Sequence, residues 1–136
     1  MVFICARYMV GRIRPNFIEM CKPSVGYLDC PTLQFITNYT CTSGKSWELV
    51  QSQRQSFFSG HASISAAIST WSIMYVQHRL KPHLQSTFSV VPWIQTIFVL
   101  ICAWMSFTRV SDYHHHFSDV LVGLVVGIIA PIIVVS

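Results

Sequence analysis

The chain has 136 residues, of which 52% are hydrophobic and only 10% are charged, and its mean hydropathy is +0.49. Soluble domains carry about 25% charged residues, so this composition excludes an ordinary soluble domain and indicates a membrane protein. The formal net charge is +4, but the basic residues are scattered and form no stripe that would bind nucleic acid. A modest positive charge suits anionic substrates or anionic lipid headgroups.

The N-terminal part is predicted to be the end of a helix followed by a long polar segment. Residues 1–5 are apolar but much shorter than the ~20 residues that a spanning helix needs. No basic region precedes them, as it would in a signal peptide, so we interpret them as the tail of a helix whose beginning is missing. Residues 7–58 begin with arginines, continue with polar residues, prolines and glycines, and are predicted to lie outside the membrane on the extracytoplasmic side.

This polar segment contains three cysteines and a glycosylation sequon. Because three is an odd number, at most one disulfide can form among Cys21, Cys30 and Cys41, and the sequence leaves open which pair it is. No two cysteines form a CxxC motif, so we expect no zinc site. The sequon at Asn38, together with the cysteines, favours an oxidising, extracytoplasmic compartment.

Three apolar stretches, residues 59–77, 90–107 and 120–135, are predicted to be spanning helices. The predicted fold class is therefore all-α, a multi-pass transmembrane helical bundle. Gly123 and Gly127 form a GxxxG pair in the third stretch, and small residues recur at spacings of three and four in the first. Both patterns let helices approach closely in a bilayer. The small residues of the first stretch are Ala62, Ser65, Ala66 and Ser69.

The basic residues between the first two stretches predict the topology. The turn at residues 78–83 should be cytoplasmic by the positive-inside rule. Residues 59–61 and 109–119 should then meet on the opposite surface, which faces the extracellular or luminal side and also carries the sequon.

A charged cluster between two apolar stretches is costly in a membrane protein and is by default a candidate functional site. Arg109, His115 and Asp119 form such a cluster, with spacings of six and four. If the chain is helical after Ser111, Asp119 shares a face with His115 and accepts its Nδ1 proton, which leaves Nε2 free to attack. A surface histidine cluster, or a metal site formed by residues 114–116, remains an alternative.

Two further clusters are expected to face the same surface. The segment Ser59-Gly60-His61 opens a predicted helix whose free N–H groups favour an anion, and His61 is placed to give a proton to a leaving oxygen. The first cluster contains Arg7, Arg12 and Arg14, of which Arg7 and Arg14 can hold phosphate oxygens. The alternatives are an ordinary helix cap beside an interfacial histidine, and arginines that contact lipid headgroups.

Together these clusters resemble the sequence pattern of the type 2 phosphatidic acid phosphatase superfamily, and of its lipid phosphate phosphatases in particular. That pattern consists of Lys-x6-Arg-Pro, Pro-Ser-Gly-His and Ser-Arg-x5-His-x3-Asp. All three parts occur here in the family's order, and the resemblance covers nearly the whole chain. The corresponding segments are Arg7-x6-Arg14-Pro15, Phe58-Ser59-Gly60-His61 and Thr108-Arg109-x5-His115-x3-Asp119.

The resemblance implies a membrane enzyme that removes phosphate from phosphatidate, lysophosphatidate, ceramide 1-phosphate and sphingosine 1-phosphate, at the plasma membrane or an endomembrane. It implies no metal and no other cofactor, and inhibition by vanadate. His115 would be the nucleophile, Asp119 would orient it, and His61 would protonate the leaving group. The phosphate-binding groups that the resemblance implies are Arg7, Arg14, Ser59, Gly60 and Arg109.

The chain also departs from the family pattern. Arg7, Phe58 and Thr108 stand where the family has lysine, proline and serine. The family core has six helices, whereas three helices and the end of a fourth are predicted here. We therefore expect a single domain over residues 1–136 that lacks its first helices and leaves its small-residue faces unpaired.

Two other functions remain open. A truncated, non-catalytic homologue would associate with full-length relatives in a homo- or hetero-oligomer, for example through the Gly123 and Gly127 face. A phosphotransferase of the same superfamily would pass the phosphoryl group to a lipid acceptor in place of water.

Overall fold

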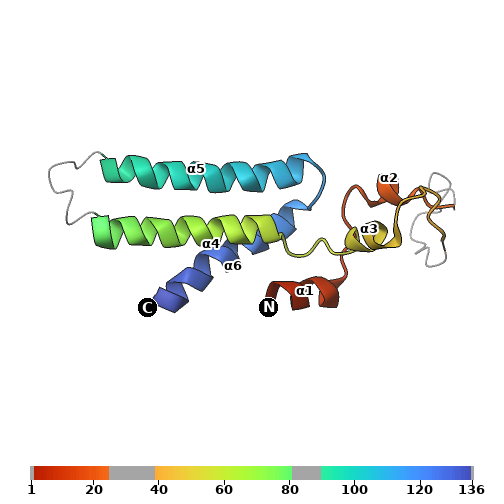
Figure 1. The fold of residues 1–136 in the computed structure, drawn as a ribbon, viewed down its shortest axis with the longest axis horizontal. Helices are drawn as coiled ribbons and strands as arrows, with labels where there is room; N and C mark the ends of the chain where they lie inside the picture. The colour runs from red at the N-terminus through yellow and green to blue at the C-terminus, as the bar shows by residue number, and fades with distance from the viewer. Residues whose placement is uncertain (1, 25–38, 81–89, 136) are drawn as a thin grey trace.

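The computed structural model describes residues 2–24, 39–80 and 90–135. Over these residues it contains helices, and the only β-pairing is an isolated bridge between Pro23 and Cys41, so the predicted all-α class is confirmed. Figure 1 shows the elements in their arrangement. In chain order they are α1 (Val2–Val10), α2 (Phe17–Cys21), α3 (Trp47–Ser52), α4 (Gly60–Tyr75), the π-helical turn η1 (Val76–Leu80), α5 (Val90–Ser111) and α6 (Phe117–Val135).

Two helices, α5 and α6, are long and apolar enough to cross a membrane. Both are longer than predicted, because α5 continues to Ser111 and α6 already begins at Phe117. Between them Tyr113 has a φ of 55°, a left-handed conformation that ends a helix. The third predicted span corresponds to α4, whose 16 residues continue into η1, and its crossing of the membrane stays a prediction.

The closest helix contact is between α4 and α6, which cross in Figure 1. A Cβ atom built on Gly123 would lie 2.6 Å from the carbonyl oxygen of Ser59, and one on Gly127 would lie 2.2 Å from that of Ser63. The two backbones can meet only because both glycines lack a side chain. The glycine face is thus occupied within the chain, which contradicts its use for a partner.

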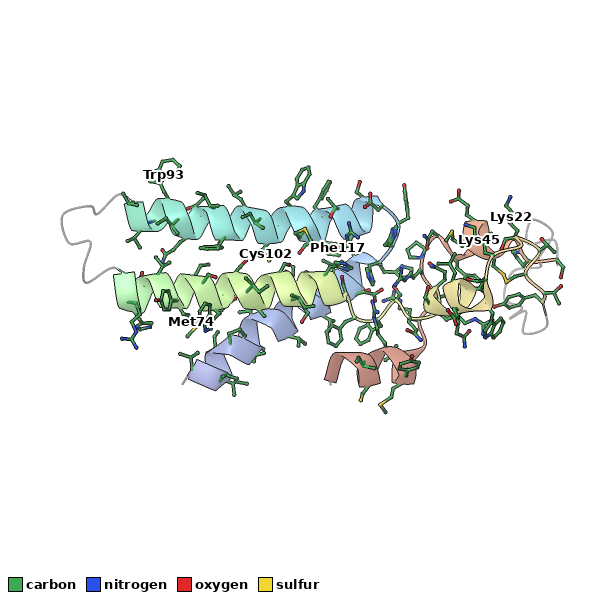
Figure 2. All side chains as sticks on the ribbon, in the orientation of Figure 1. Lys22, Lys45, Met74, Trp93, Cys102 and Phe117 are labelled. Atoms are coloured by element: carbon green, nitrogen blue, oxygen red, sulfur yellow. A yellow bond between two sulfur atoms is a disulfide. The ribbon has the colours of Figure 1, made fainter. Side chains whose placement is uncertain are left out.

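The contact between α4 and α5 is polar at several points. The Ser69 hydroxyl donates to the carbonyl of Phe98 over 3.1 Å, and the Ser65 hydroxyl lies 3.8 Å from the Cys102 sulfur. In Figure 2 Cys102 lies between the two helices, whereas Trp93 projects from α5 away from α4. The small residues of α4 are therefore covered by α6 on one side and by α5 on the other. The expectation that they would be unpaired is wrong.

The segment before α4 forms a small unit of its own. Phe17, Cys21 and Val50 from α2 and α3 make up its buried core, with Tyr39 packed against them. A disulfide joins Cys21 to Cys41, which is one of the pairings that the sequence left open. Two features of this segment lie outside the described residues, namely Cys30 and the sequon residue Asn38. Residues 81–83 of the basic turn also lie outside them.

Candidate active site

The three predicted clusters meet where the ends of α1, α4, α5 and α6 come together. The Ser59 N–H at the start of α4 donates to the carbonyl of Asp119 in the first turn of α6, over 3.0 Å. Residues 12–14 run beside residues 53–56, because Ser56 N–H donates to the Arg12 carbonyl and Arg14 N–H donates to the Gln53 carbonyl, each over 2.9 Å. The structure thus brings residues 59–61 and 109–119 to one surface. That this surface is extracellular or luminal stays a prediction.

His115 is buried, with 3% of its surface exposed. Its Nδ1–H donates to the backbone carbonyl of Ser56 over 2.8 Å. The predicted pairing of Nδ1 with Asp119 is therefore not observed. It assumed that both residues share a helix face, but α6 begins at Phe117 and leaves His115 outside the helix. A different group thus holds Nδ1, and the role of Nε2 as the attacking nitrogen stays a prediction.

Asp119 is completely buried, and its carboxylate accepts from three donors. Arg12 Nη1 donates to one oxygen over 2.6 Å, and the Ser56 hydroxyl and the His116 N–H donate to the other over 2.5 and 3.2 Å. The bond to His116 N–H also caps the start of α6, where a negative charge is stabilised by the helix dipole. A buried carboxylate needs partners of this kind to remain ionised.

The sequence pattern predicts no role for Ser56. It includes Arg12 in the first cluster but assigns no role to it. One signal could have identified Arg12 from the sequence. A buried aspartate in an apolar chain with few charges requires a cation, and Arg12 is the arginine of the first motif that phosphate binding did not use. Nothing in the sequence pattern identifies Ser56, since its contacts depend on the path of the chain after α3.

Arg14 and Arg109 carry donor groups that no side chain satisfies. The Nε–H of each is buried and makes no hydrogen bond within the described part of the chain. Burial, and then the charge of Arg7, lower the pKa of Arg14. Arg109 forms an ion pair with Asp112 at 3.4 Å. Buried, unsatisfied guanidinium donors beside a second cation are suited to an anion with several oxygens, such as phosphate.

Burial and the charges of the site lower the pKa of His115 and favour its neutral form. Burial is the largest cause, followed by the positive charge of Arg14, and together they lower the pKa of His115 to about 4. Arg7 contributes in the same direction, whereas the Ser56 carbonyl and Asp119 oppose the shift. An imidazole that is neutral near pH 7 has a free electron pair on Nε2 and can act as a nucleophile.

The Ser59-Gly60-His61 segment forms the first turn of α4. Ser59 is the N-cap, and its buried hydroxyl accepts from the Ala62 N–H over 3.5 Å, which is long for a hydrogen bond. His61 is exposed and interacts electrostatically with Arg109, Arg7 and Arg14. The exposed histidine of this turn therefore lies among the same cations that surround the buried His115.

The two other histidines of the cluster point elsewhere. His114 Nδ1 lies 2.8 Å from the carbonyl of Asp112, and His116 Nε2 lies 3.0 Å from that of Ile13. Among the residues that the structure describes, no three His, Cys, Asp or Glu side chains are grouped to hold a metal ion. The arrangement thus gives no support to the alternative of a metal site at residues 114–116.

A cavity of about 680 Å³ lies between α2 and the turn that follows α5. Its lining includes Asn16, Lys22, Asp112 and Tyr113 but none of the histidines. Asp112, which pairs with Arg109, is thus the link between this cavity and the candidate site.

Comparison with known proteins gives a consistent result. Residues 2–136 match the model of the PAP2 superfamily. The chain is 44% identical over 124 residues to the phospholipid phosphatase homolog 1.2 homolog of Caenorhabditis elegans, a match that covers 89% of the chain and 35% of that protein. It is 35% identical over 130 residues to phospholipid phosphatase 1 of Rattus norvegicus, which covers 96% of the chain and 44% of the relative. For phospholipid phosphatase 2 of Homo sapiens the identity is 36% over 122 residues, with 90% and 41% covered.

The chain therefore spans less than half the length of these relatives. No solved structure matches it significantly. The family model covers nearly the whole chain, and the motif residues that suggested the family lie together in one cluster. The chain belongs to the PAP2 superfamily.

Proposed function

We propose that this protein is a metal-independent phosphatase for lipid phosphate monoesters that acts through a phosphohistidine. The environment of His115 carries the proposal. Its Nδ1 is held by a backbone carbonyl, and its pKa is lowered so that the neutral form is favoured. The site also contains arginines with unsatisfied donors. The names of the curated relatives support a phospholipid substrate.

In the first step, Nε2 of His115 attacks the phosphorus atom of the ester. A P–N bond forms, the ester P–O bond breaks, and its electron pair leaves with the alkoxide. His61 gives that alkoxide a proton. Negative charge on the transferring phosphoryl group would be stabilised by Arg7, Arg14, Arg109, Ser59 and the N–H of Gly60.

In the second step, a water molecule attacks the phosphohistidine while His61 takes up its proton. The P–N bond breaks, inorganic phosphate leaves, and His115 returns to its neutral form. Asp119 supports the nucleophile through Ser56 and by its charge. The arginines would supply the positive charge that Mg²⁺ supplies in kinases, so no metal takes part.

The position of the site favours a lipid substrate. The cluster lies at the end of α5 and α6, the two helices that can cross a membrane, at residues 109 and 119. A headgroup phosphate can reach this level while its acyl chains stay in the bilayer. We propose phosphatidate, lysophosphatidate, ceramide 1-phosphate and sphingosine 1-phosphate as substrates, processed on the extracellular or luminal side.

The proposal is tested by phosphate release from phosphatidate in detergent micelles containing EDTA. The wild-type protein should release phosphate, His115→Ala should not, and the matched control His78→Ala, at an exposed histidine of η1, should behave like the wild type. Removal of a covalent nucleophile should lower kcat by at least about 10³-fold. Full activity in His115→Ala would refute the nucleophile, and activity that needs added Mg²⁺ or Zn²⁺ would refute the metal-free mechanism.

A further inference from the structure

Ser56 uses all of its polar groups in hydrogen bonds, two of them to His115 and Asp119. Its carbonyl accepts from His115 Nδ1 over 2.8 Å, its hydroxyl donates to Asp119 Oδ2 over 2.5 Å, and its N–H donates to the Arg12 carbonyl over 2.9 Å. Ser56 is completely buried, so water does not compete for these bonds. The bond to the carbonyl also determines which ring nitrogen of His115 carries the proton.

Arg12 also belongs to this hydrogen-bond network. Its Nη1 donates to Asp119 Oδ1 over 2.6 Å and to the Ser118 hydroxyl over 2.7 Å, while its carbonyl holds the Ser56 N–H. The guanidinium is thus directed at the buried Asp119 carboxylate, whereas Arg109 pairs with the exposed Asp112, and the buried Nε–H groups of Arg14 and Arg109 have no acceptor within the described residues. Arg12 therefore has a different task from the phosphate-binding arginines.

We propose that Arg12 and Ser56 are positioning residues of this active site. The Ser56 carbonyl keeps His115 in the tautomer that is protonated at Nδ1. The Ser56 hydroxyl and the Arg12 guanidinium hold the carboxyl group of Asp119 in place. The proposal rests on the proposed function, because it assigns these residues to the nucleophile of that reaction.

A positioning role affects the chemical step more than binding. Both side chains bond to Asp119, so their loss should lower kcat and leave KM and the inhibition constant of vanadate nearly unchanged. The loss of groups that orient a reactive side chain typically costs about 10- to 100-fold. A residue that merely stabilised the fold would instead lower the amount of active protein without changing the pH profile of the remainder.

The first experiment compares Ser56→Ala, Arg12→Gln and Arg12→Lys with the wild type. Ser56→Ala removes the hydroxyl but keeps the carbonyl, and Arg12→Lys keeps the positive charge. We expect kcat to fall about 10- to 100-fold in Ser56→Ala and Arg12→Gln, with partial recovery in Arg12→Lys and KM within about twofold of the wild type. Matched controls are Ser52→Ala and Arg79→Gln, whose side chains lie away from Asp119 and His115.

The pH profile supplies a second readout. The charges around His115 are those of Arg14, Arg7 and Asp119, and Asp119 is paired with Arg12. Removing the positive charge of Arg12 leaves the negative charge of Asp119 uncompensated beside His115, and a nearby negative charge raises the pKa of a histidine. The acid limb of kcat/KM should therefore move to higher pH in Arg12→Gln but not in Arg79→Gln. Variants with wild-type kcat and an unmoved acid limb would overturn the proposal.

A third readout does not depend on activity. Nitrogen-15 NMR of labelled histidines should show His115 protonated at Nδ1 near pH 7, with the signal assigned by its loss in His115→Asn. A proton on Nε2 would overturn the role of the Ser56 carbonyl even in a protein that releases no phosphate. An inactive wild type with the Nδ1 tautomer would instead count against the proposed function alone.

Discussion

The helical part of this molecule and the segment before it are held together in different ways. In the helical part, α4 and α6 meet at Gly123 and Gly127, where backbone lies against backbone. The segment before α4 has a small core around Phe17 and Val50, closed by the Cys21–Cys41 disulfide. Close backbone packing suits helices in lipid, where apolar side chains gain little by leaving the solvent. A short polar segment cannot bury enough surface and depends on a covalent link.

The candidate active site lies at the boundary of these two parts and uses both. His61, Arg109, His115 and Asp119 come from the helical part, whereas Arg14 and Ser56 come from the segment before it. His115 and the nearby cation Arg14 are therefore positioned by different parts of the chain, and Ser56 links the two parts through its hydrogen bond to His115. Damage to the two parts should therefore differ in its effect on the kinetics.

The largest effect is expected from Gly127→Leu, which breaks the helical part. A Cβ at this position would lie 2.2 Å from the Ser63 carbonyl oxygen, so α6 must move away from α4 and carry Asp119 with it. Overpacked contacts cost about 1–3 kcal/mol or more, and phosphate release should be lost with the fold. Unfolding in detergent, followed by circular dichroism, and phosphate release measure the two effects.

The control for this variant is Ala103→Leu, which places the same side chain at an exposed position of α5. It should retain both stability and activity. If Gly127→Leu were as stable as this control, close contact between α4 and α6 would not be what holds the helical part together.

A smaller effect is expected where the two parts interact electrostatically. Because the pKa of His115 is lowered to about 4, the acid limb of kcat/KM, which reports the free enzyme, should lie well below the ordinary histidine value of about 6.5. Arg14→Gln removes one of the charges that lower this pKa, so the limb should move to higher pH, and KM should rise as well. Arg79→Gln serves as the control, and an acid limb that stays in place in Arg14→Gln would contradict the influence of Arg14 on His115.

The same shift predicts how stability depends on pH. Between about pH 6.5 and about pH 4 the unfolded chain binds a proton at this histidine and the folded chain does not. The contribution of His115 to stability is therefore complete above that range and is lost as the pH falls through it. Denaturation of the wild type and of His115→Asn at several pH values measures the difference in their free energies of unfolding. This difference should change between about pH 6.5 and about pH 4, and it would not change with pH if His115 titrated normally.

The smallest effect on chemistry is expected from Cys41→Ser, which breaks the segment before α4. Loss of a disulfide that joins residues 20 positions apart costs about 2–4 kcal/mol. The backbone N–H of Arg14 donates to the Gln53 carbonyl in this segment, so loosening the segment should displace Arg14 from the phosphate. KM should therefore rise severalfold while kcat changes little. Limited proteolysis and steady-state kinetics test both expectations against Cys5→Ser, a free cysteine. A kcat that fell as strongly as KM rose would contradict the separation of the two parts.

Much of the helical part was predictable, because helix signals are local. Apolar stretches with small residues at spacings of three and four predicted α4 and its packing face, and the GxxxG pair predicted a close helix contact. The predicted ends of α5 and α6 were less accurate, since the turn depends on the left-handed Tyr113. The motif residues were identified by spacing, and the structure brings them together.

By itself, the sequence determined the helical class, the family and the candidate site residues, because composition, periodicity and motif spacing can be read along the chain. The tertiary structure alone decided which groups hold them. Arg12 and Asp119 are 107 residues apart, and Ser56 and His115 are 59 apart. No local pattern links such pairs, because a buried carboxylate and a buried imidazole take whichever partners the folded chain brings within hydrogen-bonding distance.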